Sequence, residues 1–161
     1  MLIDLLVDVA ALIEVTVALE KVAVSPREPA ATDKCDAAYV WGSQIFDSPI
    51  GVQERGNEAG CFFRRAYEIR YRIDVCDPPR DDGREHTTSD MGAKADEFYT
   101  YADDVWCAIA HAASDGTLFD PPNTTKCEDI VVGPINFSGQ ADRISAEGSI
   151  RVTHPCSPQG S

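Results

Sequence analysis

Three histidines and six cysteines are the side chains of this chain that most readily take part in chemistry. His86 follows Asp81, Asp82 and Glu85 in the segment RDDGREH, and an imidazole beside carboxylates can bind a metal ion or abstract a proton. The segment is typical of a solvated loop, in which nothing fixes the geometry that either role requires. We therefore interpret this cluster as loop surface rather than as a site.

Cys107 and His111 lie one turn apart on a predicted helix, where a thiol and an imidazole could pair as a nucleophile and its base. Pairs at this spacing are frequent in helices, and no third group that would orient the imidazole is evident. His154 lies near the end of a predicted strand and has no partner visible in the sequence. The adjacent Asp103 and Asp104 diverge by about 100° on a helix, so they cannot act on one substrate together.

The sequence contains no GxSxG, P-loop, dinucleotide-binding or HExxH motif. Its cysteines have no CxxC or histidine-rich spacing, which argues against zinc. We therefore expect no catalytic residue, no metal ion and no cofactor, and we do not expect an enzyme. The cysteines are Cys35, Cys61, Cys76, Cys107, Cys127 and Cys156.

The N-terminal stretch MLIDLLVDVAALIEVTVALEKV is apolar, but Asp4, Asp8 and Glu14 exclude a membrane span, and a signal peptide would have a basic start. Without a signal peptide, the default is reduced thiols in a cytosol. The stretch instead predicts a helix that is buried on most sides, in its own core or against a neighbouring subunit. One stripe of this helix collects Asp4, Asp8, Ala11, Glu14, Ala18 and Lys21.

The total charge and length restrict the class of protein. The chain of 161 residues suits one domain, and its net charge of -13 comes from 27 acidic and 14 basic residues. Binding of nucleic acid through charge needs clustered Lys and Arg, and this chain is poor in both, so we expect no sequence-specific binding of nucleic acid. An acidic protein can still line a passage through which DNA moves without sticking.

The segment CFFRRAYEIRYRIDVC, residues 61–76, predicts a long strand, because apolar and charged residues alternate along it. Cys61 and Cys76 would end this strand about 50 Å apart, too far for a disulfide. One face is rich in Tyr and Ile and would pack the core. The other face would form an exposed charged ladder, either solvated or in contact with another subunit. As a candidate oligomer interface we select Glu68, Arg70, Arg72 and Asp74.

Other elements surround this strand. Residues 35–49 predict a short strand or two, and residues 93–114 predict a second helix, with caps among Thr88, Ser89 and Asp90 and with Gly116 past its end. The buried stripe of that helix is predicted to contain Phe98, Ala102, Val105, Ile109 and Ala112. The predicted loops are 25–34, 50–60, 76–92 and 115–126. Loops of this length favour a functional role in reaching neighbours.

Residues 128–137 and 144–154 predict an antiparallel hairpin with two possible registers. In one register Val131 faces Val152, Phe137 faces Ala146, and Cys127 lies opposite Cys156. In the other register, Ile130 faces Val152, Val132 faces Ile150, and the two cysteines lie on opposite faces. The sequence does not choose between them. Pro134 indicates a sheet edge or a bulge, and an edge is where another subunit could add a strand.

The order of elements has no βαβ repeat, which predicts an α+β fold with a mainly antiparallel sheet flanked by two helices. We expect a single domain over residues 1–156 and a frayed tail over 157–161. The early helix, the long strand, the helix containing WCAIA and the closing hairpin GPINFSG…GSIRVTH resemble the tail terminator proteins of long-tailed phages, the lambda-type family. The resemblance covers nearly the whole chain through element order and the GPI…GSIRV ending.

The resemblance implies a structural virion protein whose copies form a homo-oligomer, a hexameric ring that caps the tail tube. Such a ring stops tube polymerisation and provides a docking face for the head, so its partners are the tail tube protein and a head–tail connector or neck protein. It implies a location at the head-proximal end of the virion tail, after assembly in the host cytoplasm. DNA would pass through the lumen, no membrane is involved, and the family has no catalytic residues to carry over.

Two other classes of protein stay open. One is a different part of the same machine, such as a neck, connector, tail completion or tail tube subunit. A tube subunit would form long polymers alone, whereas a terminator should stay as closed rings or monomers. The other class is a monomeric small-molecule-binding protein or an uncharacterised α+β enzyme, which would show a deep apolar pocket with converging polar groups and no self-association.

Overall fold

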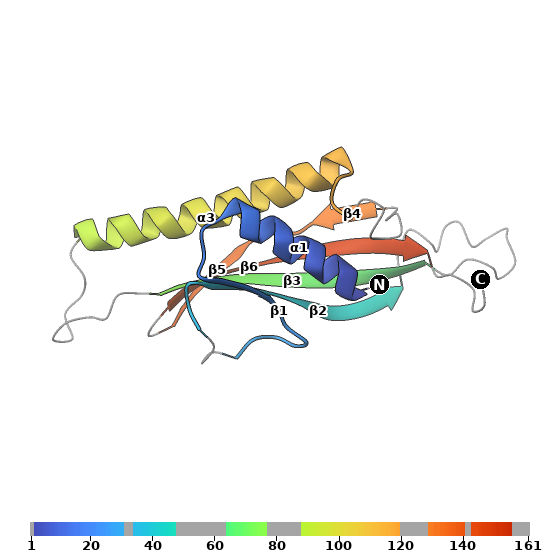
Figure 1. Cartoon of the computed structure of the whole chain (residues 1–161), viewed down its shortest axis with the longest axis horizontal. Helices are drawn as coiled ribbons and strands as arrows, with labels where there is room; N and C mark the ends of the chain where they lie inside the picture. The colour runs from blue at the N-terminus through green and yellow to red at the C-terminus, as the bar shows by residue number, and fades with distance from the viewer. Residues whose placement is uncertain are drawn as a thin grey trace, which may run out of the picture.

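The computed structural model describes residues 2–30, 34–47, 64–76, 88–119, 129–140 and 143–155. In these residues two helices, α1 (Leu2–Thr16) and α3 (Thr88–Asp115), cover one face of a six-stranded sheet, as Figure 1 shows. Every strand pair is antiparallel except β1 with β2, so the predicted α+β class is confirmed. The strands are β1 (Lys21–Val24), β2 (Ala37–Asp47), β3 (Arg64–Cys76), β4 (Asp129–Val132), β5 (Asn136–Gln140) and β6 (Arg143–Pro155).

The long predicted strand is the centre of the sheet. The strand order is β1-β2-β3-β6-β4, with β5 also paired to β6, so β3 lies between the two other long strands. Its apolar face is turned towards the helices, where Ile69, Tyr71, Ile73 and Val75 are fully buried. The ring of Tyr71 lies over Gly148, its partner on β6, and a side chain at that position would overlap the ring. The period-two pattern therefore placed the core face correctly.

Helix α1 buries only one side of its surface in this protomer. Leu5, Leu6, Val9 and Ile13 enter the core, whereas other apolar side chains of the helix stay exposed. The prediction of a helix buried on most sides is therefore not met within the chain itself. The helix is also shorter than the apolar stretch, because the chain turns after Thr16 and Lys21 already begins β1. No helix in the described ranges is long and apolar enough to cross a membrane.

Helix α3 begins earlier than predicted, at Thr88, so the expected loop over 76–92 is too long at its C-terminal end. Thr88 to Asp90 occupy its first turn, where short polar residues are favoured. The predicted buried stripe is confirmed for all its residues except Ala112, which is half-buried. Gly116 adopts a left-handed φ of 71°, as the sequence predicted for the residue past the helix end.

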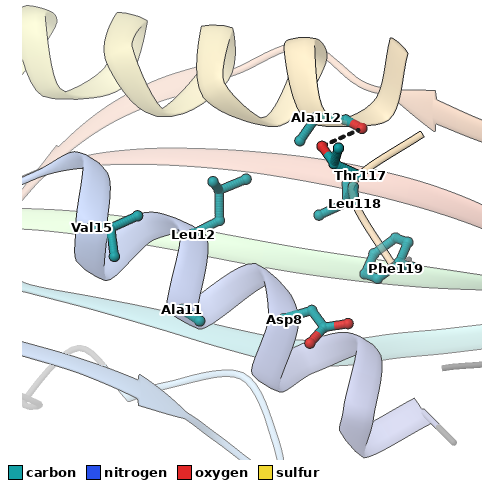
Figure 2. Close-up of a pocket in the computed structure, with 8 residues that line it drawn as sticks. All are labelled: Asp8, Ala11, Leu12, Val15, Ala112, Thr117, Leu118 and Phe119. Atoms are coloured by element: carbon teal, nitrogen blue, oxygen red, sulfur yellow. Dashed lines mark hydrogen bonds between the residues drawn. The ribbon is translucent and has the colours of Figure 1, made fainter. Parts of the chain in front are cut away.

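The chain after Gly116 folds back towards α1. The backbone amides of Thr117 and Leu118 both donate to the carbonyl of Ala112, at 3.0 and 2.9 Å. This arrangement satisfies a terminal helix carbonyl and turns Leu118 and Phe119 towards α1. Figure 2 shows the groove that these residues form with α1.

The closing hairpin uses both of the predicted registers, one in each half. In β4 Ile130 pairs with Val152, whereas in β5 Phe137 pairs with Ala146, so the register differs by one residue between the two strands. Residues 133–135 separate the strands and absorb the difference, which confirms the break predicted at Pro134. Gly133 packs closely there: its amide donates to Ser149 O at 2.8 Å, and a Cβ would lie 2.5 Å from Ser149 Oγ, so a side chain would force Ser149 to shift.

The structure contains a disulfide that the sequence did not predict. Cys35 and Cys76 are bonded, with their Cα atoms 5.2 Å apart, so the expectation of reduced thiols is wrong for this pair. The reason lies in the β2–β3 register: Ala37 pairs with Asp74, and the same register carried outward sets Cys35 opposite Cys76. The predictions for Cys61, Cys127, Cys156, the loop over 50–60 and the tail over 157–161 lie outside the described residues.

Candidate functional site

The candidate interface residues of β3 lie together on the face of the sheet that is turned away from the helices. The pairing partners place Arg72 between Tyr39 and Glu147, and Asp74 between Ala37 and Ser145. We call this surface the polar face. Alternation along β3 was enough to group its charged residues, but their partners on β2 and β6 depend on registers that the sequence did not give.

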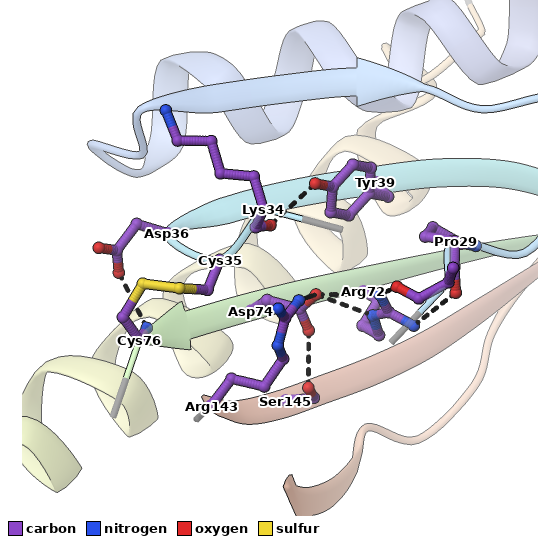
Figure 3. Close-up of polar contacts among 11 residues, drawn as sticks. Pro29, Lys34, Cys35, Asp36, Tyr39, Arg72, Asp74, Cys76, Arg143 and Ser145 are labelled. Carbon is purple, nitrogen blue, oxygen red and sulfur yellow. Dashed lines mark hydrogen bonds and ion pairs between the residues drawn. A yellow bond between two sulfur atoms is a disulfide. The ribbon is translucent and has the colours of Figure 1, made fainter. Parts of the chain in front are cut away.

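Asp74 is the centre of a buried ionic cluster, shown in Figure 3. Ser145 Oγ donates to Asp74 Oδ1 at 2.6 Å. Arg72 binds Asp74 Oδ2 through Nε at 3.1 Å and Nη2 at 3.0 Å, and Arg143 Nη1 lies 3.4 Å from the same oxygen. A fully buried carboxylate is stable only with such partners, because it has lost its hydration.

Arg72 also fixes the chain segment that crosses the polar face. Its Nη1 donates to Pro29 O at 3.1 Å and its Nη2 to Ala30 O at 3.4 Å. Its guanidinium lies 5.8 Å from the centre of the Tyr39 ring, and the Tyr39 hydroxyl donates to Lys34 O. Each of these contacts of the Arg72 guanidinium is therefore made within the protomer.

The disulfide lies at the same end of the face. Cys76 N donates to Asp36 Oδ1 at 3.1 Å, directly beside the bonded sulfurs (Figure 3). Ala37, Tyr39 and Trp41 form a second small apolar cluster on this face, and all of them are buried. This end of the polar face is therefore part of the protein interior.

The other end of the face is open. Glu68 is buried and accepts a hydrogen bond from Gln44 Nε2 at 3.0 Å, but its other neighbours reach solvent. Arg70, whose side chain is 42% exposed, lies 3.1 Å from Glu147 Oε1 and 3.6 Å from Glu68 Oε2. Arg151 Nη2 lies 3.9 Å from Glu68 Oε1 and is more exposed still.

The expectation of an exposed charged ladder is therefore wrong for Glu68, Arg72 and Asp74, which are buried within the protomer. The segment at Pro29 covers Arg72, and all three residues have neighbours on β6 that sequence reasoning missed. Those partners are Arg143, Ser145, Glu147 and Arg151. Their own period-two spacing was the signal that could have found them. Contact of any of these residues with another subunit stays a prediction.

A second surface was not predicted. On the flank of α3, Tyr99 and Trp106 lie over the outer strands β4 and β5 and, with Phe137, form what we call the aromatic edge. The rings of Tyr99 and Phe137 are 5.2 Å apart, and that of Phe98 lies 5.6 Å from Phe137. Trp106 Nε1 donates to Gly133 O at 3.0 Å. Tyr99 is 55% exposed and Phe137 54%, which is unusual for side chains of this size.

The remaining candidates show no catalytic arrangement in the described part of the chain. Cys107 Sγ lies 3.9 Å from Asp103 Oδ1, and no hydrogen bond joins it to His111 in the described ranges. Burial, followed by the nearby carboxylates of Asp103 and Asp104, raises the pKa of the Cys107 thiol, which is the opposite of what a nucleophile needs. His86 and the side chain of His154 lie outside the described residues.

The described residues contain no group of three or more His, Cys, Asp or Glu side chains that could hold a metal ion. Comparison of the chain with protein-family models gives no match. Comparison with curated proteins gives none either. The function therefore has to be argued from the surfaces described above.

Proposed function

We propose that the chain is a structural virion protein, a phage tail terminator whose copies form a ring at the end of the tail tube. The observation that carries the proposal is the aromatic edge, where Tyr99, Trp106 and Phe137 border strands β4 and β5. Exposed aromatic side chains beside an open sheet edge mark a protein–protein contact rather than a solvated surface. The α+β fold and the order of its elements agree with the family that the sequence resembles.

The two edges of the described sheet are different, which allows neighbouring copies to pair one edge with the other. One edge is formed by β1, a short strand that begins with Lys21, and the opposite edge by β4 and β5. A contact between two different edges is heterologous, and heterologous contacts close into rings or extend into filaments. Such a ring would meet the tail tube protein on one side and a connector or neck protein on the other.

The acidic composition is consistent with a lumen through which DNA slides. The chain has a net charge of -13, and Asp96, Asp103 and Asp104 are exposed on the outer side of α3. Repulsion between these carboxylates and phosphates would prevent binding. An outer-wall position of α3 in an assembled ring would exclude this part of the proposal.

Another component of the same machine, a neck, connector or tube subunit, is the nearest alternative. Among the described residues, the groove between α1 and the end of α3, which measures about 350 Å³, favours a monomeric ligand-binding protein or enzyme. Its lining offers one carboxylate, from Asp8, rather than the several converging polar groups of a small-molecule site.

Variants of the aromatic edge test the proposal. Replacing Tyr99 and Phe137 together by serine removes exposed apolar surface and also ring contacts with the buried Phe98, so circular dichroism must first show that the variant keeps its fold. We expect the mass measured by light scattering after size exclusion to fall from that of an oligomer to that of a monomer. The matched control is Ile45→Ser, an exposed apolar residue on β2 that should leave the mass unchanged. Equal masses for both variants and the unmodified protein would exclude this edge as the assembly contact.

A further inference from the structure

Helix α1 carries an apolar row that the protomer leaves uncovered. Ile3, Val7, Ala11 and Val15 follow one another at intervals of four residues, and all are exposed, Val15 by 81%. Residues at this interval lie on one side of a helix, and the row extends about 18 Å along the axis. The opposite side of α1 packs on the sheet through Val9 and Ile13. Helix α1 therefore presents apolar residues both to the core and to its outer surface.

The row leads into the groove at the end of α3. Ala11, Leu12 and Val15 of α1 form one wall of this cavity of about 350 Å³. The other wall consists of Ala112, Thr117, Leu118 and Phe119, as Figure 2 shows. The hydrogen bonds from Thr117 and Leu118 to the carbonyl of Ala112 hold that wall in place. The row and the groove together form one continuous surface, which we call the α1 surface.

The charge on the α1 surface has a single sign. Helix α1 contains Asp4, Asp8 and Glu14 and no lysine or arginine. Asp8 is half-buried at the groove, and among the described residues its carboxylate has no hydrogen bond or ion pair. Burial and, to a smaller extent, the neighbouring Asp4 raise the pKa of Asp8. A carboxylate that has lost part of its hydration and has no cation beside it would be stabilised by a partner that supplies one.

The charge decides between the possible occupants. The same surface of a second copy would bring Asp4, Asp8 and Glu14 opposite the same acidic residues, and an anionic membrane surface would also be repelled. We propose that the α1 surface is the docking site for an amphipathic helix of a different protein, with apolar side chains at intervals of three and four residues and Lys or Arg beside them. Such a helix would set its apolar row against Val7, Ala11 and Val15 and a cation against Asp8. This proposal does not depend on ring formation, because the aromatic edge lies on other elements.

The probe is a fluorescein-labelled synthetic peptide of about four helical turns, with Leu at helical spacing and Arg on both sides of the Leu row. Its binding is followed by fluorescence anisotropy at low and at physiological salt. We expect the Val7→Ser/Val15→Ser variant to bind about tenfold more weakly, because exposed apolar contact is lost. We expect Asp8→Asn to bind about threefold more weakly, with a smaller effect of salt on the affinity.

Two controls separate docking from unspecific attraction. Asp104→Asn removes the same charge from an exposed position of α3 that does not line the groove, and it should leave the affinity unchanged. A peptide with Glu in place of Arg should not bind. Hydrogen exchange of the unmodified protein with the Arg peptide should show slower exchange in residues 2–16 and 112–119, a readout that needs no variant.

Three results would overturn the proposal. The first is equal weakening by Asp104→Asn and Asp8→Asn, which would mean that only net charge matters. The second is unchanged binding by Val7→Ser/Val15→Ser. The third is a fall in the protein's own oligomeric mass in that variant, which would place a second copy on this surface. Absence of rings in the unmodified protein would count against the proposed function alone and would leave this test as it stands.

Discussion

The polar face of β3 has two ends that look alike in the sequence and differ in the structure. At one end, Asp74 and Arg72 are buried, fully partnered and adjacent to the Cys35–Cys76 disulfide. At the other end, Glu68 is also buried, but the arginines beside it, Arg70 and Arg151, are exposed and lie 3.6 and 3.9 Å from its carboxylate. We call these the closed end and the open end.

The difference teaches that alternating charge along a strand does not reveal which charges meet water. What decides it is the segment through Pro29 and Ala30, which crosses the closed end and is held by Arg72. At the closed end the charges contribute to the fold. At the open end Arg70 remains exposed, so of the four residues predicted as an oligomer interface it is the one that stays accessible to a partner.

The largest effect should come from the centre of the closed end. Replacing Asp74 by alanine leaves two buried arginines without their carboxylate, which we expect to lower the free energy of unfolding by about 3–5 kcal/mol. Urea denaturation followed by circular dichroism measures the change. Glu147→Ala at the open end is the matched control, with an expected loss below about 1 kcal/mol. Similar losses for both variants would remove the distinction between the two ends.

The disulfide of the closed end should have the next largest effect. Its two cysteines are separated by 41 residues, and a loop of this size corresponds to about 3–4 kcal/mol of stabilisation through the unfolded state. Cys35→Ser should therefore lower the free energy of unfolding by that amount under non-reducing conditions. Cys107→Ser, at a free thiol, should change it little. Alkylation of both Cys35 and Cys76 in the denatured, unreduced protein would show that the bond does not form.

A substitution on the opposite face of β3, the face turned towards the helices, should raise the free energy of unfolding. The hydroxyl of Tyr71 is buried without a hydrogen-bond partner in the described part of the chain, and burial raises its pKa. Removing an unsatisfied polar atom while keeping the ring should stabilise the protein. We expect Tyr71→Phe to raise the free energy of unfolding by about 1 kcal/mol in the same urea assay. A loss of comparable size would mean that the hydroxyl has a partner.

The smallest effect on stability should come from Arg70 at the open end. Arg70→Glu breaks the partly exposed ion pair with Glu147 and the longer contact with the buried Glu68, which we expect to cost about 1 kcal/mol. If the open end contacts a neighbouring subunit, the same variant should still reduce the oligomeric mass, since it places like charges opposite one another. An unchanged mass would remove Arg70 from the interface.

Much of the fold followed from the sequence. Alternation located β3 and its buried face, and the stripe from Phe98 to Ile109 located the buried side of α3. The sequence could not decide the register of the closing hairpin, because both possible registers place apolar residues opposite one another. The structure uses each of them in one half, on either side of Pro134. The Cys35–Cys76 bond was missed for the same reason, since it depends on the β2–β3 register.

The site was less predictable than the fold. Grouping Glu68, Arg70, Arg72 and Asp74 required only a period of two, but the burial of Arg72 depended on Pro29, 43 residues away in the chain. The aromatic edge was missed because Tyr99 and Phe137 belong to different elements. Only the tertiary structure brings their rings to 5.2 Å.

The most direct test of the proposed function is the mass of the unmodified protein. Light scattering behind size exclusion would be measured over a range of protein concentrations, with negative-stain images of the main peak. The account predicts closed rings, either alone or when tail tubes are added. A concentration-independent monomer that forms no ring beside tail tubes would contradict it, and long filaments formed by the chain alone would identify a tube subunit instead.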